Sequence, residues 1–107
     1  MNSDLRFPSA TYLQSPTEPL FPLGHLLVTP GALALLKKLT HPPLKFLARH
    51  WFGDWGDIGE ADRQANQDAL IDGDRLFSAY DLGTEQRLWI ITEADRSSTT
   101  LLLPEEY

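Results

Sequence analysis

Hydrophobic side chains recur at helical spacing in the first half of the chain and at a spacing of two in the second half. Threonine and proline at positions 29 and 30 predict a helix start, because threonine caps helices and proline is favoured at the first helical position. This helix is expected to end near residues 39–41. Prolines at 42 and 43 predict a second helix, whose expected buried face is formed by Leu44, Leu47, Ala48 and Trp51. The same pattern places His50 on the opposite, solvent side.

The second half of the chain begins with a glycine-rich turn at residues 53–57, where a helix cannot readily continue. A third helix is expected at about 59–71, before Asp72 and Gly73. From Arg75 onward the alternation predicts strands at 75–81, 88–93 and 99–103, with turns around Gly83 and at 94–98. The predicted fold class is therefore α+β, with about three short N-terminal helices packed on a three-stranded antiparallel β-meander.

Residues 1–22 differ in composition from the rest and are interpreted as a proline-rich flexible arm. Their four prolines favour extended backbone and interrupt any apolar stretch, which argues against a secretory signal. Residues 23–107 are expected to form a single α+β domain. No apolar run reaches the roughly 20 residues needed to cross a bilayer, so we expect a cytoplasmic protein with no membrane partner.

The charge and the lack of cysteine narrow the function classes further. The net charge is -6 and the isoelectric point about 4.8, which argues against direct nucleic-acid binding because that depends on clustered Lys and Arg. Without cysteine, disulfides, thiolate metal sites and cysteine nucleophiles are excluded. An acidic surface suits a basic surface of another protein. We therefore expect a protein partner and no cofactor, and the edge strand at 99–103 leaves a homodimer open.

No catalytic residue is assigned, but four polar residues around the 53–57 turn are candidates for a metal site: His50, Asp54, Asp57 and Glu60. Histidine and carboxylates bind divalent metals, and a metal there would activate water in a small hydrolase or nuclease. The alternative is that the aspartates cap backbone N–H groups and that His50 complements the helix dipole. Sequence motifs for a serine nucleophile, a phosphate-binding loop or a dinucleotide site are absent.

Two turns supply the candidates for contact with a partner: Trp55, Asp54, Asp95, Arg96 and Ser97. Trp55 lies between glycines in a polar turn and is the tryptophan expected to be exposed, as a binding anchor. Trp51 and Trp89 are expected to be buried. In the second turn, Asp95 and Arg96 are placed to form an ion pair, and the alternative for this segment is ordinary turn chemistry.

Residues 53–57 (GDWGD) and 88–107 (LWIITEADRSSTTLLLPEEY) resemble a family of small proteins carried on bacterial plasmids and integrative elements. Its members are usually labelled plasmid-related proteins and sometimes type I restriction subunit M. The resemblance spans about residues 23–107 and implies a mobile-element context, without catalytic residues to carry over. A DNA methyltransferase needs a domain several times larger than this chain, so that activity is not inferred.

These observations favour a small acidic, non-enzymatic interaction protein of a bacterial mobile element. Its expected partner is a host or element-encoded protein, with counter-defence as one role of the binding. Two alternatives stay open: a small metal-dependent hydrolase or nuclease that uses the His/Asp/Glu cluster, and a toxin–antitoxin component, which the length of the chain permits.

Overall fold

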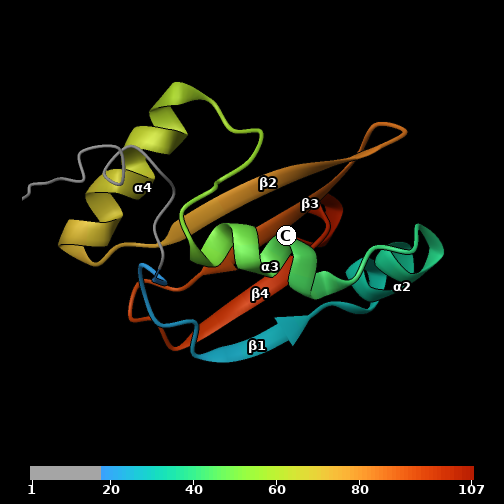
Figure 1. The fold of residues 1–107 in the computed structure, drawn as a ribbon, viewed down its shortest axis with the longest axis horizontal. Helices are drawn as coiled ribbons and strands as arrows, with labels where there is room; N and C mark the ends of the chain where they lie inside the picture. Colours follow the sequence, from blue (N-terminus) through green and yellow to red (C-terminus); the bar gives the residue numbers. More distant parts are fainter. Residues whose placement is uncertain (1–17) are drawn as a thin grey trace, which may run out of the picture.

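The structure is a computed structural model that describes residues 18–107. Its elements are, in chain order, β1 (His25–Val28), α2 (Pro30–Lys38), α3 (Pro43–Trp51), α4 (Glu60–Asp72), β2 (Leu76–Gly83), β3 (Gln86–Thr92), β4 (Ser98–Leu102) and the 3-10 helix η1 (Pro104–Glu106). The predicted α+β class and the three helices are confirmed (Figure 1). Within this part of the chain, no helix has the length and apolar character needed to cross a membrane. Most of the predicted arm, residues 1–17, lies outside the described residues.

The sheet has four strands in the order β1-β4-β3-β2, one more than predicted. β2, β3 and β4 form an antiparallel meander, and β1 pairs parallel to β4, with His25 opposite Ser98 (Figure 1). The prediction of a purely antiparallel, three-stranded sheet preceded only by helices was therefore wrong. β1 is a short apolar run without alternation, and its partner strand lies at the other end of the chain. No local pattern records such a pairing.

This topology changes which strands lie at the edges of the sheet. β4 lies between β1 and β3, so the strand predicted at 99–103 is interior and its edge is not available for a homodimer. The two edge strands are β1 and β2. An edge strand presents unpaired N–H and C=O groups unless another part of the protein covers them.

The outer edge of β2 is covered by the 53–57 turn. The Ala79 N–H donates to the carbonyl of Trp55 (3.1 Å), and the Ala79 carbonyl accepts from the N–H of Asp57 (2.6 Å). Two residues further along β2, the Asp81 N–H donates to the Asp57 carboxylate at 3.0 Å. The turn therefore continues the sheet by a short bridge.

α4 covers the other half of this edge through Asn66, which is 2% exposed. Its side-chain amide donates to the Phe77 carbonyl (2.7 Å) and accepts from the Phe77 N–H (3.0 Å), so it imitates a neighbouring strand. This amide fixes α4 to β2.

Replacing Asn66 by alanine is expected to lower the free energy of unfolding by about 2 kcal/mol, because both backbone groups of Phe77 lose their partner. Chemical denaturation measures the change. The neighbouring Gln67 is exposed on the same helix, and Gln67→Ala should change the free energy by less than about 0.5 kcal/mol. Equal losses in the two variants would contradict a specific role for the Asn66 amide.

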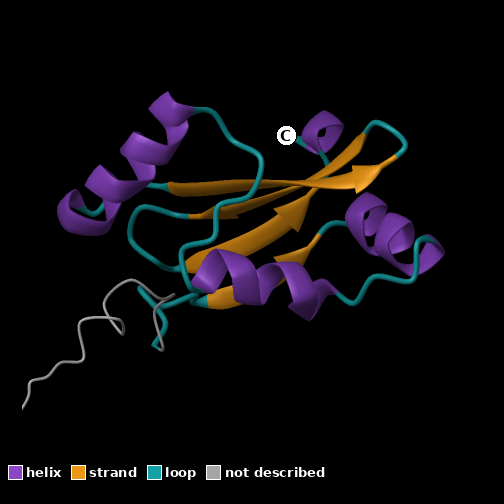
Figure 2. Cartoon of the chain, turned by 45° about the horizontal axis from the view of Figure 1, so that its top comes forward, coloured by secondary structure: helices purple, strands orange, loops and turns teal. Residues whose placement is uncertain are grey.

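α2 and α3 lie on one side of the sheet, while η1 lies on the other side (Figure 2). The core between the two helices and the sheet contains Ala32, Leu36, Phe46, Leu47, Tyr80, Leu82, Leu88, Ile90 and Leu101. A second cluster, at the end of the sheet near α4, contains Phe21, Trp55, Ala69 and Leu76. Phe21, which belongs to the segment interpreted as an arm, is 7% exposed.

The buried face of α3 shares Leu47 with the predicted face but is rotated away from Leu44. Phe46, Leu47 and His50 point into the protein, whereas Leu44 is 67% exposed. The apolar residues of this helix form a broad face, so the periodicity alone left the buried direction within that face ambiguous. His50 is buried because the sheet supplies polar partners for its ring.

Candidate functional site

The four residues considered for a metal site, His50, Asp54, Asp57 and Glu60, do not converge. His50 is fully buried, and Asp57 contacts the edge of β2 as described above. Asp54 accepts from Arg49 at 2.7 Å, and Glu60 lies exposed in α4, 3.9 Å from Arg63. Residues 18–107 contain no group of three or more His, Cys, Asp or Glu side chains that could hold a metal ion. The four residues are close in the sequence, but each side chain contacts a different part of the protein.

Trp55 is 1% exposed, so the prediction that it is an exposed anchor was wrong. Positive φ angles at Gly53 and Gly56 turn the chain so that the indole points inward. The ring stacks on Phe21 at 6.2 Å between centroids and meets the ring of His50 edge-on at 5.6 Å. The indole N–H has no hydrogen-bond partner among the described residues. Trp55 is a core residue.

Asp54, the neighbouring candidate, is held by an ion pair on the surface. The Arg49 guanidinium keeps the pKa of this carboxyl below its usual range, and the carboxylate in turn raises the pKa of Arg49. The guanidinium also lies 4.6 Å from the centroid of the Tyr80 ring, and the Tyr80 hydroxyl donates to the Asp54 carbonyl at 2.6 Å. These contacts fix the turn and leave Asp54 as a structural group.

The second predicted contact segment, Asp95, Arg96 and Ser97, is held by turn chemistry. The Asp95 carboxylate accepts from the Ser97 N–H at 3.0 Å, and the hydroxyl of Ser97 helps to lower the pKa of this carboxyl. The predicted ion pair between Asp95 and Arg96 does not form. The Arg96 guanidinium donates instead to the carbonyls of Ala69, Asp74, Glu93 and Ala94. Arg96 therefore ties the hairpin to the end of α4.

A series of buried hydrogen bonds runs between α3 and the sheet. Ser78 Oγ lies 2.6 Å from His50 Nδ1, and His50 Nε2 lies 2.9 Å from Thr92 Oγ1. Thr92 Oγ1 is 2.8 Å from Thr99 Oγ1, which donates to the Leu23 carbonyl at 2.8 Å. The four side chains are fully buried.

The last hydrogen bond of this series, from Thr99 to the Leu23 carbonyl, fixes the direction of all the others. Thr99 uses its single hydroxyl proton on a carbonyl, so it accepts from Thr92, and Thr92 in turn accepts from His50. His50 is therefore the Nε2–H tautomer, and its unprotonated Nδ1 accepts from Ser78. Burial lowers the pKa of His50 from 6.5 to about 3, which keeps the ring neutral.

A serine beside a histidine is also the arrangement of a nucleophile and its base. Ser78 and His50 are both 0% exposed, however, and neither lines any of the three surface hollows considered below. A substrate has no route to the hydroxyl. We assign this pair to the structure of the core.

The side of the sheet opposite α2 and α3 carries a group of large aromatic side chains. Phe77 and Trp89 come from β2 and β3, and their ring centroids are 5.1 Å apart with the rings nearly perpendicular. Tyr107, after η1, lies against Trp89 at 5.7 Å. Phe77 and Trp89 are half-buried and Tyr107 is 72% exposed. With Arg75 and Ile91, described next, these side chains form what we call the aromatic face.

Arg75 holds the C-terminal tyrosine in place. Its Nη1 donates to the Tyr107 hydroxyl at 2.6 Å, and its guanidinium carbon lies 5.8 Å from the centroid of the tyrosine ring. Arg75 is exposed beside β2, so this contact crosses the surface of the sheet. The aromatic face is thus stabilised by a hydrogen bond and by a cation–π contact.

Two shallow hollows flank Tyr107 on this face. One, of about 300 Å³, is lined by Asp62, Arg75, Phe77, Trp89, Ile91 and Tyr107. The other, of about 330 Å³, shares Arg75, Ile91 and Tyr107 and adds Glu93, Thr100, Leu102 and Glu106. Both combine apolar side chains with carboxylates, Asp62 in the first hollow and Glu93 and Glu106 in the second. Such a hollow can take an apolar side chain of a partner while a carboxylate contacts a cationic group.

Sequence reasoning missed the aromatic face, although the alternation contained part of the signal. The pattern separated Phe77 and Trp89 from the residues on the other side of their strands. It did not show which side the helices cover, and Trp89 was therefore predicted as buried. The contribution of Tyr107 follows from the C-terminal segment folding back, which no periodicity records.

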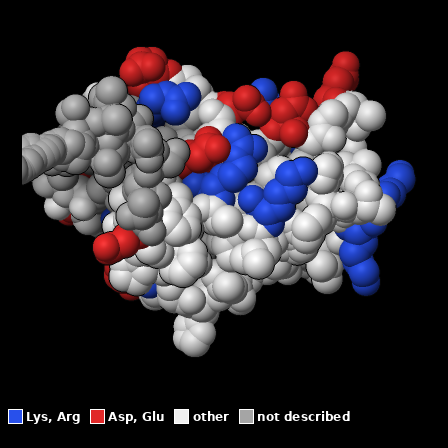
Figure 3. Space-filling model, viewed as in Figure 1, with Lys and Arg blue, Asp and Glu red and all other residues white. Residues whose placement is uncertain are grey.

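Charge is unevenly distributed on the helix-covered side of the molecule (Figure 3). Acidic side chains gather along the upper margin, over α4 and β2, and lysine and arginine side chains lie below them and over α2. The lower centre, where β1 lies in Figure 1, is uncharged. An edge strand of the sheet therefore coincides with an uncharged surface.

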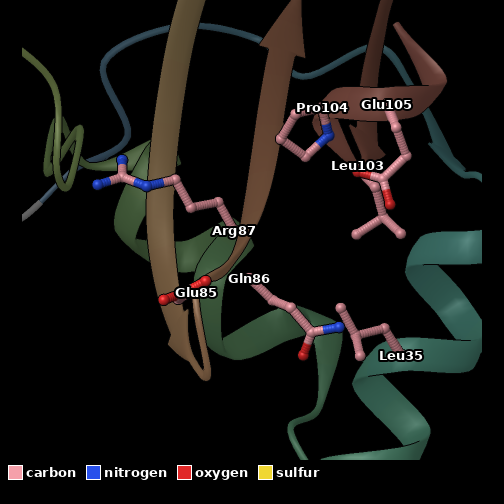
Figure 4. Close-up of a pocket in the computed structure, with 7 residues that line it drawn as sticks. All are labelled: Leu35, Glu85, Gln86, Arg87, Leu103, Pro104 and Glu105. Atoms are coloured by element: carbon pink, nitrogen blue, oxygen red, sulfur yellow. The ribbon is translucent and has the colours of Figure 1, made fainter.

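A third hollow, of about 290 Å³, lies between the β2–β3 hairpin, α2 and the start of η1 (Figure 4). Leu35 and Leu103 supply apolar side chains, and Glu85 and Glu105 supply carboxylates. The guanidinium of Arg87 points away from the two leucines, and its Nη1 donates to the Asp57 carbonyl at 3.0 Å. This hollow lacks a cluster of aromatic side chains and is a poorer binding candidate than the aromatic face.

Comparison of the chain with family models, curated proteins and solved structures finds no significant match in any of the three.

Proposed function

We propose that this protein is an interaction module that binds a protein partner through its aromatic face. The observation that carries the proposal is the cluster of Trp89, Tyr107 and Arg75 on the side of the sheet opposite α2 and α3. Trp, Tyr and Arg are the residue types that contribute most of the binding energy at protein interfaces.

The charge of the chain supports a partner with a basic surface. The net charge is -6, and Asp62 and Glu93 are among the residues that line the hollows beside Tyr107. A partner that inserts an apolar side chain and places a lysine or arginine beside it matches both features. The proposal requires no cofactor and no catalytic group.

The resemblance of residues 53–57 and 88–107 to plasmid and integrative-element proteins supports a biological setting for this binding. The partner is then a bacterial host protein or another protein of the same mobile element. Interference with a host defence system is the role that we put forward for the complex. The location of such a partner makes the cytoplasm the expected compartment.

The test is affinity capture from a bacterial host, with the wild type and the variant Tyr107→Ala compared side by side. Tyr107 is 72% exposed and lies outside the strands, so its truncation leaves the sheet intact. We expect the retained partner to bind at least about tenfold more weakly to the variant, as for an interface hot spot. Purified partner and titration calorimetry give the number.

The matched control is Ile71→Ala, which removes an apolar side chain that is 85% exposed on α4. This variant should bind as the wild type does. Trp89→Ala, with an unchanged far-UV circular dichroism spectrum, should repeat the loss seen with Tyr107→Ala. A partner that binds both aromatic variants as tightly as the wild type would overturn the proposal.

A further inference from the structure

β1 is an edge strand whose outer backbone groups have no partner strand within residues 18–107. The N–H groups of His25 and Thr29 both donate to carbonyls of the β4 side at 3.0 Å. Successive strand residues direct their N–H and C=O groups to alternate sides, so Leu27 also faces β4. Leu26 and Val28 therefore direct their N–H and C=O groups away from the sheet.

The side chains of β1 are apolar and exposed. Leu26 is 53%, Leu27 52% and Val28 36% exposed, and the strand contains no Lys, Arg, Asp or Glu. Natural proteins usually protect an edge with charged side chains, a bulge or a covering segment. The β2 edge is covered in this way, but no described residue covers the β1 edge. On the helix-covered side, the surface around it is uncharged as well (Figure 3). On the rest of its surroundings, the Glu106 carboxylate is held at Thr29 and Gly31, just after the strand.

We propose that β1 binds a second copy of this chain, antiparallel about a two-fold axis, so that the two four-stranded sheets become one continuous sheet. The strand favours a second copy because it is self-complementary: in an antiparallel pair, its outward-facing residues Leu26 and Val28 meet Val28 and Leu26 of the other copy. Two chains with a net charge of -6 repel each other over most of their surfaces, and β1 lets them meet along a strand that carries no charge.

The register of the pairing follows from the backbone. In an antiparallel pair, residues with outward backbone groups face one another, so Leu26 lies opposite Val28 of the second copy and Leu27 faces Leu27 across the axis. If the register shifted in one direction, Pro30 would enter the pairing, and proline has no N–H to donate. A shift in the other direction brings in Gly24, whose φ of 66° is not that of a strand.

This register satisfies the outward N–H and C=O groups of both copies. It also buries Leu27 against its counterpart on the side of the aromatic face, and Leu26 against Val28 on the helix side. The interface uses the edge of the sheet, whereas the proposed protein partner binds its open face. The two proposals can therefore fail separately.

Light scattering at high micromolar concentration tests the association directly. The expected mass is 24.2 kDa, twice the 12.1 kDa of one chain. Leu27→Lys places two ammonium groups opposite each other at the axis and should give a monomer. Its fold should be intact by circular dichroism, because lysine is common on exposed edges. The control Ile71→Lys, at an exposed position of α4, should remain dimeric. A monomeric wild type, or a dimer that survives Leu27→Lys, overturns the proposal.

Cross-linking tests the register, because the chain has no cysteine of its own. Leu27→Cys places two thiols in a facing pair with Cα atoms about 4.5 Å apart, which a disulfide spans. Oxidation should give a covalent dimer on a non-reducing gel. Leu26→Cys and Val28→Cys should each form no covalent dimer alone but should cross-link when mixed. Failure of Leu27→Cys to cross-link would overturn the antiparallel pairing.

Discussion

Lowering the pH from 7 to 5 is expected to reduce the free energy of unfolding by about 2 kcal/mol through His50 alone. Burial lowers the pKa of this ring from 6.5 to about 3 in the folded protein. Between these two values the unfolded chain binds a proton that the folded protein does not. The stabilisation is therefore complete above pH 6.5 and is lost as the pH falls toward 3, at about 1.4 kcal/mol for each pH unit.

The surroundings of the ring make His50 the source of this effect. Ser78, Thr92, Phe21 and Trp55 contact it, and none of them ionises in this range. Protonation would also put a hydrogen on Nδ1, which accepts from Ser78 in the folded protein. The carboxyls with lowered pKa values change the free energy of unfolding mainly below pH 5, so the change between pH 7 and 5 is assigned to the histidine.

Urea denaturation at pH 7, 6 and 5 measures the slope, and His50→Gln tests its origin. A glutamine amide can accept from Ser78 and donate to Thr92 but does not titrate. We expect the slope between pH 7 and 5 to disappear in this variant. His25→Gln, at an exposed position of β1, should keep the wild-type slope. An unchanged slope in His50→Gln would show that another group is responsible.

His50 also shows the limit of reading α3 from its sequence. The residues at i, i+3, i+4 and i+7 from Leu44 formed an acceptable apolar face, and a histidine near the C-terminal end of a helix has a ready explanation in the dipole. The true face was selected by Ser78 and Thr92, which lie on two strands far along the chain. The buried direction of a helix depends on its partners as well as on its own pattern.

The strands that are neighbours in the sequence were predicted well, because β2, β3 and β4 are joined by short turns and their alternation is local. β1 was missed since its parallel partner is distant and its four residues are all exposed. The same omission hid the aromatic face. Without β1 and η1, nothing indicated which side of the sheet the helices left uncovered.

The candidate contact residues were chosen because they are polar or aromatic residues in turns, and turns lie at the surface. In this fold the turns are held by internal bonds. Arg96 donates to four carbonyls. The bridge between Gly56 and Ala79 fixes the turn against β2 with the Trp55 side chain directed into the core. A turn that closes a sheet edge has few side chains left for a partner. The uncovered sheet face offers more.

Gly56→Ala is expected to damage the fold severely, with a loss of at least about 3 kcal/mol in the free energy of unfolding. Gly56 has a φ of 77°, where a residue with a Cβ is strained. A Cβ there would lie 2.2 Å from the Ala79 carbonyl oxygen and 2.6 Å from Cδ1 of Tyr80. The backbone must move, and the bonds between Ala79 and the turn are lost with it. Thermal and urea unfolding measure the loss.

The control is Gly59→Ser, three residues further along the chain. Gly59 has a φ of -74°, a Cβ there meets nothing within 4 Å, and serine is a better helix cap than glycine. This variant should be as stable as the wild type or slightly more stable. Wild-type stability in Gly56→Ala would contradict the role assigned to the turn. If the turn serves only to close the β2 edge, the Gly56→Ala variant should fail to bind the protein partner only under conditions in which the variant is unfolded. The Tyr107→Ala variant, in contrast, should fail to bind the partner while it remains folded.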